Sequence, residues 1–263
     1  MSAPDENPAP PDETPAPMSA LPAPPPASPP TDRWAHRRTE PRGLAFLWTC
    51  YLLAATAISI GQLGRIGLTT YEVYRPSARL LLTFVLLGVA VFWPMVRLSQ
   101  EAPGRPIRSF LADAVVVLSP GAAIILSQSL PGMAGWPLEV TLMITLFAVA
   151  WSALVCGVLG FAMTSTLPRW CWMVGMVALA AAGPGIAALL ALGGEEGDVN
   201  PFLLTSPLTV TFEVTRDRLW AGVTAEVLPS HWAALAAVSG LGVTALSAGA
   251  IRTSRVAPVR SVA

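Results

Sequence analysis

Residues 138–163 read LEVTLMITLFAVAWSALVCGVLGFAM, and no charged residue occurs from Val140 to Pro168. The hydrocarbon core of a bilayer is about 30 Å thick, a distance that about 20 consecutive helical residues span. A charge-free run of this length therefore predicts a transmembrane helix over Leu138–Met163.

Further apolar runs lie on both sides of this one. Over the whole chain 53% of the residues are hydrophobic and 12% are charged, against about 25% charged in an ordinary soluble domain. We therefore predict an all-α, polytopic helical membrane protein with about six transmembrane helices, contained in a membrane domain over residues 33–263. The second run is short, but Arg79 and Arg97 at its ends can snorkel to the membrane surfaces. The other five predicted spans are 43–64, 80–96, 110–130, 170–193 and 232–251.

The N-terminal tail, residues 1–32, has a different composition. Its first thirty residues hold twelve of the 26 prolines, mixed with alanine, serine and four carboxylates. Such a stretch buries too little apolar surface to offset the entropy of ordering it, so we predict a disordered Pro/Ala-rich tail that samples extended polyproline conformations. It lacks the basic start and the apolar core of a secretory signal. A plain spacer is the simpler interpretation, and a PxxP-type partner site is the alternative.

The placement of arginine predicts the orientation. With the N-terminus inside, eleven arginines fall on inner segments and five on outer segments, as the enrichment of basic residues in cytoplasmic loops requires. Both termini are therefore predicted to be cytoplasmic, in a plasma or inner membrane. Tryptophans near the predicted span ends fit an aromatic belt: Trp48, Trp93, Trp136, Trp170, Trp172 and Trp232.

The absence of lysine excludes several mechanisms. All sixteen basic residues are arginine, so the chain has neither a Walker A loop nor a lysine Schiff base, and ATP-driven work needs a partner. A net charge of zero gives no field that would attract nucleic acid. Cys50, Cys156 and Cys171 lie in apolar runs without CxxC spacing, and the two histidines are far apart. We therefore expect no metal and no cofactor.

Six spans also raise the hypothesis of an intramembrane protease. A serine protease needs a serine and a histidine base at working depth. Residues 237–240 (AVSG) lack the leading glycine of a G-x-S-G motif, His231 lies at the edge of its span, and His36 lies in the tail. An aspartyl protease needs a Gly-Asp pair within spans, whereas Gly197-Asp198 lies in a loop. We therefore expect no enzyme activity.

Two carboxylates lie near span interiors. Asp113 and Glu139 are each within about a turn of a span end, and Asp113 is close in sequence to Arg105 and Arg108 and to a helix N-terminus, where the dipole favours an anion. We interpret both carboxylates as structural. No Asp, Glu, His or Arg falls in the middle of a predicted span, which argues against a proton relay or an ion-coupled carrier.

Glycines predict where the helices touch. Gly157 and Gly160 on the fourth span, and Gly240 and Gly242 on the sixth, allow close approach of helices. The Gly183-Pro184-Gly185 sequence must kink or break the fifth span, because proline lacks the backbone donor and clashes with the preceding turn. This kink is either plain packing or a hinge.

The longest outer segment, residues 194–231, contains an alternation. Leu208, Val210, Phe212 and Val214 alternate with polar residues, and a period of two is typical of a strand. Leu208 and Phe212 also fit a short helix lying against the membrane. We favour the helix, because a lone strand at a bilayer surface has no partners for its backbone groups.

The layout over residues 33–253 resembles that of the ABC-2-type transporter permeases, the membrane halves of ATP-driven exporters. The similar segments are RRTEPR at 37–42 before the first span, RLSQEAPGR at 97–105 after the second, and NPFLLTSPL at 200–208 after the fifth. The Glu-x-x-x-Gly-Thr pattern common in that family after the second span is not matched, since Glu101 is followed by Gly104-Arg105.

The resemblance implies a permease subunit that relies on a separate ATPase subunit. The loop from 97 to 108 is basic and is the longest predicted cytoplasmic connection between spans, so we predict that it docks the ATPase through Arg97, Glu101, Arg105 and Arg108. The alternatives are a non-catalytic scaffold or assembly subunit of a membrane complex and, third, a small-molecule carrier. The expected partners are the lipid bilayer, the ATPase and further copies or subunits in an oligomer, without nucleic acid.

Overall fold

The computed structural model describes residues 41–61, 70–103, 105–192, 201–217 and 225–256, and every regular element within them is a helix. All of them belong to the second of the two units into which the chain divides, residues 34–263, and the predicted tail lies outside the described residues. Six segments are long and apolar enough to cross a membrane, which confirms the predicted all-α fold with six spans. They are Gly43–Ile60, Val73–Leu98, Pro106–Ser127, Leu138–Thr164, Arg169–Leu192 and Pro229–Ser254.

Five of the spans are single helices, and the second is composite. The single helices are α2 (Pro41–Ile60), α5 (Pro106–Ser127), α6 (Leu138–Thr164), α7 (Arg169–Leu192) and α10 (Pro229–Val256). The second span consists of α3 (Tyr71–Leu87), the π-helix η2 (Gly88–Phe92) and α4 (Trp93–Leu98). Two short helices, α8 (Pro201–Thr205) and α9 (Val210–Val214), lie between the fifth and sixth spans, so the preference for helix over strand is confirmed there.

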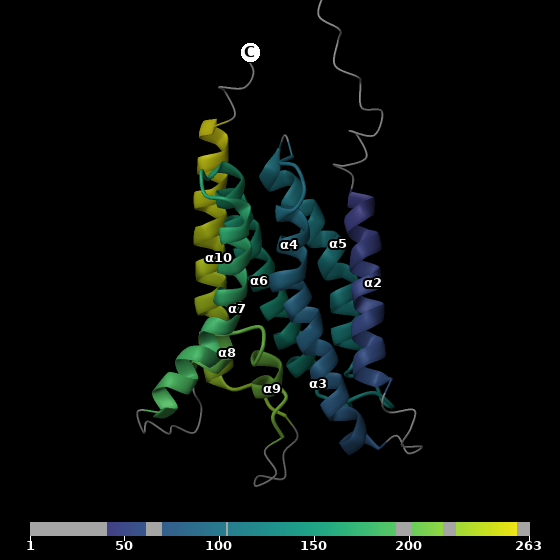
Figure 1. The fold of residues 1–263 in the computed structure, drawn as a ribbon. Coiled ribbons are helices and arrows are strands. Elements are labelled where there is room, and N and C mark those ends of the chain that lie inside the picture. Colours follow the sequence, from purple (N-terminus) through teal and green to yellow (C-terminus); the bar gives the residue numbers. More distant parts are fainter. Residues whose placement is uncertain (1–40, 62–69, 104, 193–200, 218–224, 257–263) are drawn as a thin grey trace, which may run out of the picture. The chain divides into compact units, whose positions relative to one another are not determined.

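The connections lie at two opposite ends of the spans. In Figure 1, α8 and α9 lie toward one end, and the connection between α4 and α5 lies at the other. The start of α2 and the end of α10 are found at the same end as the α4–α5 connection. An even number of spans requires this arrangement.

The second span begins at Val73 rather than at Leu80. Arg79 was expected to bound this span, because charges are usually kept out of hydrocarbon. In the structure Arg75 and Arg79 both lie on α3 and each forms an ion pair with Asp217 at 2.9 Å. Their charges are compensated within the protein, so the helix runs through both positions.

The π-helical turn of the second span precedes Pro94. A proline has no backbone N–H with which to continue the helical ladder, and the N–H of Trp93 bonds to Gly88 O, five residues back. Trp48 of α2 packs on this turn, since a side chain at Gly88 would lie 2.5 Å from the indole. Tyr51 of α2 donates its hydroxyl to a backbone carbonyl of α3 at 2.7 Å. The widened turn therefore packs against Trp48 and Tyr51 of α2.

The fourth and sixth spans pack closely through glycines. α6 is the most buried of the spans, and both Gly157 and Gly160 face the backbone of α10. On α10, a side chain at Gly249 would lie 2.9 Å from Gly157 O, and one at Gly242 would lie 3.0 Å from a carbonyl oxygen of α6. Small residues permit this approach between membrane helices. A side chain at Gly240 would meet no atom of the described residues within 4 Å, so the contact predicted for Gly240 is not found among them.

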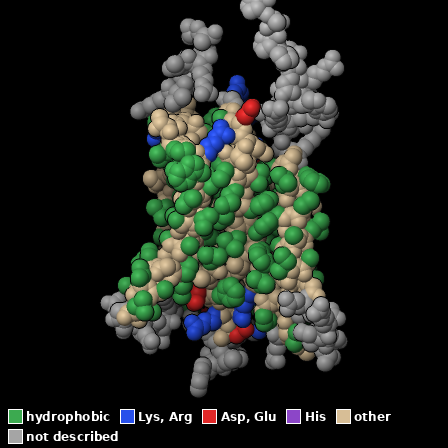
Figure 2. All heavy atoms as spheres, in the orientation of Figure 1, with side chains coloured by type: hydrophobic (Ala, Val, Ile, Leu, Met, Phe, Trp, Pro, Cys, Tyr) green, Lys and Arg blue, Asp and Glu red, His purple; other side chains and the backbone are tan. Residues whose placement is uncertain are grey.

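The outer surface of the spans is apolar. Figure 2 shows hydrophobic side chains over the middle of the visible face and charged side chains toward its two ends. Large apolar side chains such as Phe46 on α2, Val115 on α5 and Leu189 on α7 are exposed. Soluble proteins rarely expose continuous apolar surface of this extent. Together with the six apolar helices, this surface defines a multi-pass membrane protein.

Candidate functional site

The loop that connects α4 to α5 was predicted to dock a partner through four residues. The structure separates these residues into two groups. Glu101, Arg105 and Arg108 are exposed, whereas Arg97 is only 4% exposed. Three of the four side chains therefore lie on the surface at this end of the spans, and Arg97 does not.

Arg97 forms a buried ion pair with Asp113 of α5. Nε and Nη2 of Arg97 donate to the two carboxylate oxygens of Asp113, and Nη1 donates to Gln100 Oε1 at 2.7 Å. The expectation that Arg97 snorkels is therefore wrong, because its guanidinium finds a carboxylate inside the protein. Asp113 in turn is bonded to an arginine of the preceding span and not to Arg105 or Arg108, which are nearer to it in the sequence. The pair joins the two spans across the base of the loop.

Arg169, the first residue of α7, ties the fifth span to the same loop. Its Nη1 donates to Gln100 O at 2.5 Å and to Leu98 O at 3.4 Å. Carbonyls at the C-terminus of a helix lack intrahelical donors, and a cation satisfies them. The base of the loop is thus bonded to the third span by Arg97 and to the fifth span by Arg169. No local pattern identifies these acceptors, which lie far from Arg169 along the chain.

The middle of α7 makes a second set of contacts, at its proline. The helix is continuous from Arg169 to Leu192 with Pro184 inside it. Because proline has no N–H, it leaves the carbonyl of Ala180, four residues earlier, without its helical donor. Ser206 supplies one: its Oγ donates to Ala180 O at 2.6 Å, and the residue is 1% exposed. Hydroxyl side chains satisfy proline-freed carbonyls in this way within membranes.

Gly183 provides the space for this contact. A side chain at Gly183 would collide with the backbone carbonyl of Phe202 in α8 and with the side chain of Ser206. Gly185, by contrast, has open space around it. Figure 1 shows the last part of α7 leaning away from the neighbouring spans. A packing role for Gly183 is thus visible, and the hinge role of Gly183, Pro184 and Gly185 stays a prediction.

The segment containing α8 and α9 packs against four spans. Ala180 lies twelve residues before Leu192, the end of α7 (192 − 180), which corresponds to about 18 Å along the helix axis. On the other side, Thr211 Oγ1 lies 2.5 Å from Thr83 Oγ1 of α3. The two short helices contact α7 and α10 through α8, and α3 and α6 through α9. We call residues 201–217 the re-entrant segment.

Two arginines of α3 bind the C-terminal end of the re-entrant segment. Asp217 accepts hydrogen bonds from Arg75 Nη1 and Arg79 Nη2, both at 2.9 Å. Arg79 also donates to Thr215 O at 2.7 Å and to Thr215 Oγ1 at 2.9 Å. The three charged side chains are between 18% and 24% exposed. We call Arg75, Arg79 and Asp217 the outer latch.

The outer latch could not be predicted from the sequence. Arg75 and Arg79 lie 142 and 138 residues before Asp217, and only the tertiary fold brings them together. One signal was present, since arginines four residues apart lie on one face of a helix. Two charges on one face beside an apolar run indicate a partner for that face.

Of the residues considered for catalysis, His231 and Ser239 lie on α10, and His36, Gly197 and Asp198 lie outside the described residues. His231 is 3% exposed, and its Nδ1 accepts a hydrogen bond from the N–H of Leu228 at 3.1 Å. Ser239 lies two turns further along the same helix, α10. Within the described ranges, no three His, Cys, Asp or Glu side chains are grouped so that they could hold a metal ion.

The fold and these contacts define a six-span helical membrane protein with a re-entrant segment at one end and a clamped basic loop at the other. No family model, no curated protein and no solved structure matches the chain.

Proposed function

We propose that the protein is the membrane-spanning permease subunit of an ATP-driven, ABC-2-like transporter that relies on a separate ATPase subunit. The observation that supports this most is the bonding of α7 at two levels. Its first residue, Arg169, bonds to the α4–α5 loop, and its middle bonds to the re-entrant segment through Ala180 and Ser206. One helix thus connects the face where an ATPase would dock with a segment at the opposite end.

The proposed docking surface is the exposed part of the loop and the start of α5. Because Arg97 is neutralised by Asp113, the exposed charge is that of Arg105 and Arg108 against Glu101, a net charge of +1. An acidic surface on the ATPase would complement it, and such charges act mainly on association rate and salt dependence. In this proposal Arg97 positions the loop and does not contact the ATPase.

The proposed orientation has this surface in the cytoplasm. It is supported by the sequence, in which eleven arginines fall on predicted inner segments and five on predicted outer segments. The start of α2 and the end of α10 lie at the same end as the loop (Figure 1), so both termini would be cytoplasmic. The re-entrant segment would then face the outside.

The re-entrant segment is suited to close the outer end. It contacts four spans, and its polar bonds go to α3 and α7. Passage of a substrate to the outside would require this segment to move away from α3, and the outer latch opposes that movement. Movement of the α4–α5 loop, transmitted by α7, would act on the re-entrant segment at Ser206, which bonds to α7.

Purification with its native partners tests the proposal. The protein is isolated in mild detergent from its own membrane, at low salt and with nucleotide, and co-purifying proteins are identified by mass spectrometry. We expect a nucleotide-binding subunit, and we expect its recovery to fall when Arg105 and Arg108 are both changed to glutamate. Arg252→Glu, which changes an exposed arginine of α10, is the matched control and should leave recovery unchanged. Purification without any nucleotide-binding subunit would favour a scaffold role instead.

A further inference from the structure

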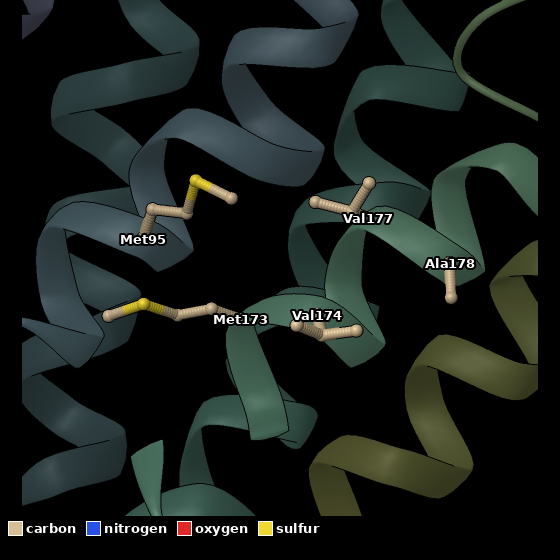
Figure 3. Close-up of a pocket in the computed structure, with 5 residues that line it drawn as sticks. All are labelled: Met95, Met173, Val174, Val177 and Ala178. Atoms are coloured by element: carbon tan, nitrogen blue, oxygen red, sulfur yellow. The ribbon is translucent and has the colours of Figure 1, made fainter. Parts of the chain in front are cut away.

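An apolar groove lies between the second and fifth spans. It is lined by Met95 of α4 and by Met173, Val174, Val177 and Ala178 of α7, and its volume is about 320 Å³. Figure 3 shows Met95 and Met173 extending from the two helices on either side of the groove. All five side chains are at least partly exposed, so the groove opens to the surface that faces lipid.

A charged residue, Arg169, precedes the first groove residue of α7, Met173, by one helical turn. Arg169, Met173 and Val177 are spaced by four residues, so they lie on one face of α7 in successive turns. Val177 lies eight residues from Arg169, or about 12 Å along the helix. Trp170, beside Arg169, is 64% exposed, as tryptophans at headgroup level are. Arg169 therefore lies on the same face of α7 as the groove residues Met173 and Val177, one turn nearer to the end of the spans.

Arg169 has donors left for a ligand. Within the described part of the chain, both of its acceptors, Leu98 O and Gln100 O, bond to the same nitrogen, Nη1. A guanidinium carries five N–H donors, so Nε and Nη2 of this exposed side chain can bond to an anion outside the chain. The planar fork of arginine matches the oxygens of a phosphate.

We propose that this groove binds one anionic phospholipid of the cytoplasmic leaflet, with its phosphate on Arg169 and one acyl chain between α4 and α7. The volume lies at the lower end of the range of about 300–1,000 Å³ that small-molecule sites occupy. The groove lining has no polar side chain that could bind a peptide or a polar metabolite. The side of the groove that opens to the bilayer suits a lipid, because the second acyl chain of the lipid can stay in the bilayer. The bound lipid would contact α4, which leads into the α4–α5 loop, and α7, whose Arg169 bonds to that loop. The site does not depend on transport activity.

Native mass spectrometry of the full-length protein tests this site. Dioleoyl phosphatidylglycerol is titrated onto protein in mild detergent, with dioleoyl phosphatidylcholine as the zwitterionic comparison. We expect one phosphatidylglycerol to bind at lower concentration than phosphatidylcholine. Arg169→Gln should weaken this binding about fivefold, which corresponds to about 1 kcal/mol for one basic residue near an anionic lipid. Arg169→Lys should retain most of the affinity.

Two matched pairs separate a specific site from lipid bound at random. Ala178→Phe fills the groove and should abolish the tight phosphatidylglycerol site, whereas Ala188→Phe, at another exposed position of α7, should not change it. Arg252→Gln removes an exposed arginine at the same end and should have no effect. All variants are first shown to elute and melt like the unmodified protein. Equal binding of the two lipids would overturn the proposal, and so would equal effects of the two variants within either pair. Either result would mean that the protein binds only the non-specific lipid that surrounds any membrane protein.

Discussion

Changing Asp113 to alanine tests whether the buried ion pair holds the α4–α5 loop in place. Arg97 and Asp113 are 4% and 1% exposed, so the variant leaves a guanidinium inside the protein without its carboxylate. Removing one partner of a buried ion pair costs about 3–5 kcal/mol. For a chain of this length each kcal/mol corresponds to roughly 2–4 °C in Tm. We therefore expect Tm to fall by roughly 6–20 °C.

The measurement is thermal unfolding in mild detergent at pH 7, followed by tryptophan fluorescence and checked by size-exclusion chromatography. Glu213→Ala is the control, because Glu213 is 3.9 Å from Arg216, which is 63% exposed, and such pairs contribute at most about 1 kcal/mol. Arg97→Met combined with Asp113→Leu removes both charges and should recover most of the lost stability. A single variant that melts within about 2 °C of the unmodified protein, or a double variant as unstable as the single one, would refute this reasoning.

Three further predictions concern the contacts between helices. Ser206→Ala leaves the proline-freed carbonyl of α7 without a donor and should cost about 1–3 kcal/mol in the same melting assay; an unchanged Tm would contradict the pairing. Gly157→Leu should prevent α10 from packing on α6 and abolish the monodisperse peak in chromatography, whereas Gly240→Leu, which points into open space, should leave the peak intact. Asp217→Asn should weaken the outer latch. In a background without the native cysteines, it should speed the maleimide labelling of a cysteine introduced at Thr211. Equal labelling rates with and without Asp217→Asn would show that the latch does not hold the re-entrant segment.

Much of the fold follows from the sequence because each span is a local property. A largely apolar run of about 20 residues has few alternatives to crossing a membrane, and each of the six predicted runs overlaps a helix long and apolar enough to span one. The start of the second span was misplaced because Arg75 and Arg79 are tolerated inside the helix. That tolerance depends on Asp217, whose position the local sequence does not reveal.

The candidate site was harder to predict, because its bonds join distant segments. The alternation around Phe212 is typical of a strand, and a helix was favoured only because a lone strand at a bilayer surface lacks backbone partners. Nothing in the alternation indicated that the segment packs against four spans. Pro184 indicated a kink, yet the donor for the freed carbonyl, Ser206, had to come from another helix. Arg97 was expected to serve a partner outside the protein, and its carboxylate was found on the next span. Hydropathy and local motifs do not encode such pairings.

Photo-crosslinking in native membranes tests the central claim most directly. Benzoylphenylalanine is placed at Arg105 on the proposed docking surface and, separately, at Leu130, which follows α5 toward the opposite end and is 54% exposed. We predict that position 105 captures a protein with a P-loop nucleotide-binding domain and that position 130 does not. Capture of that protein only from position 130, or from neither position while nucleotide is present, would contradict the account.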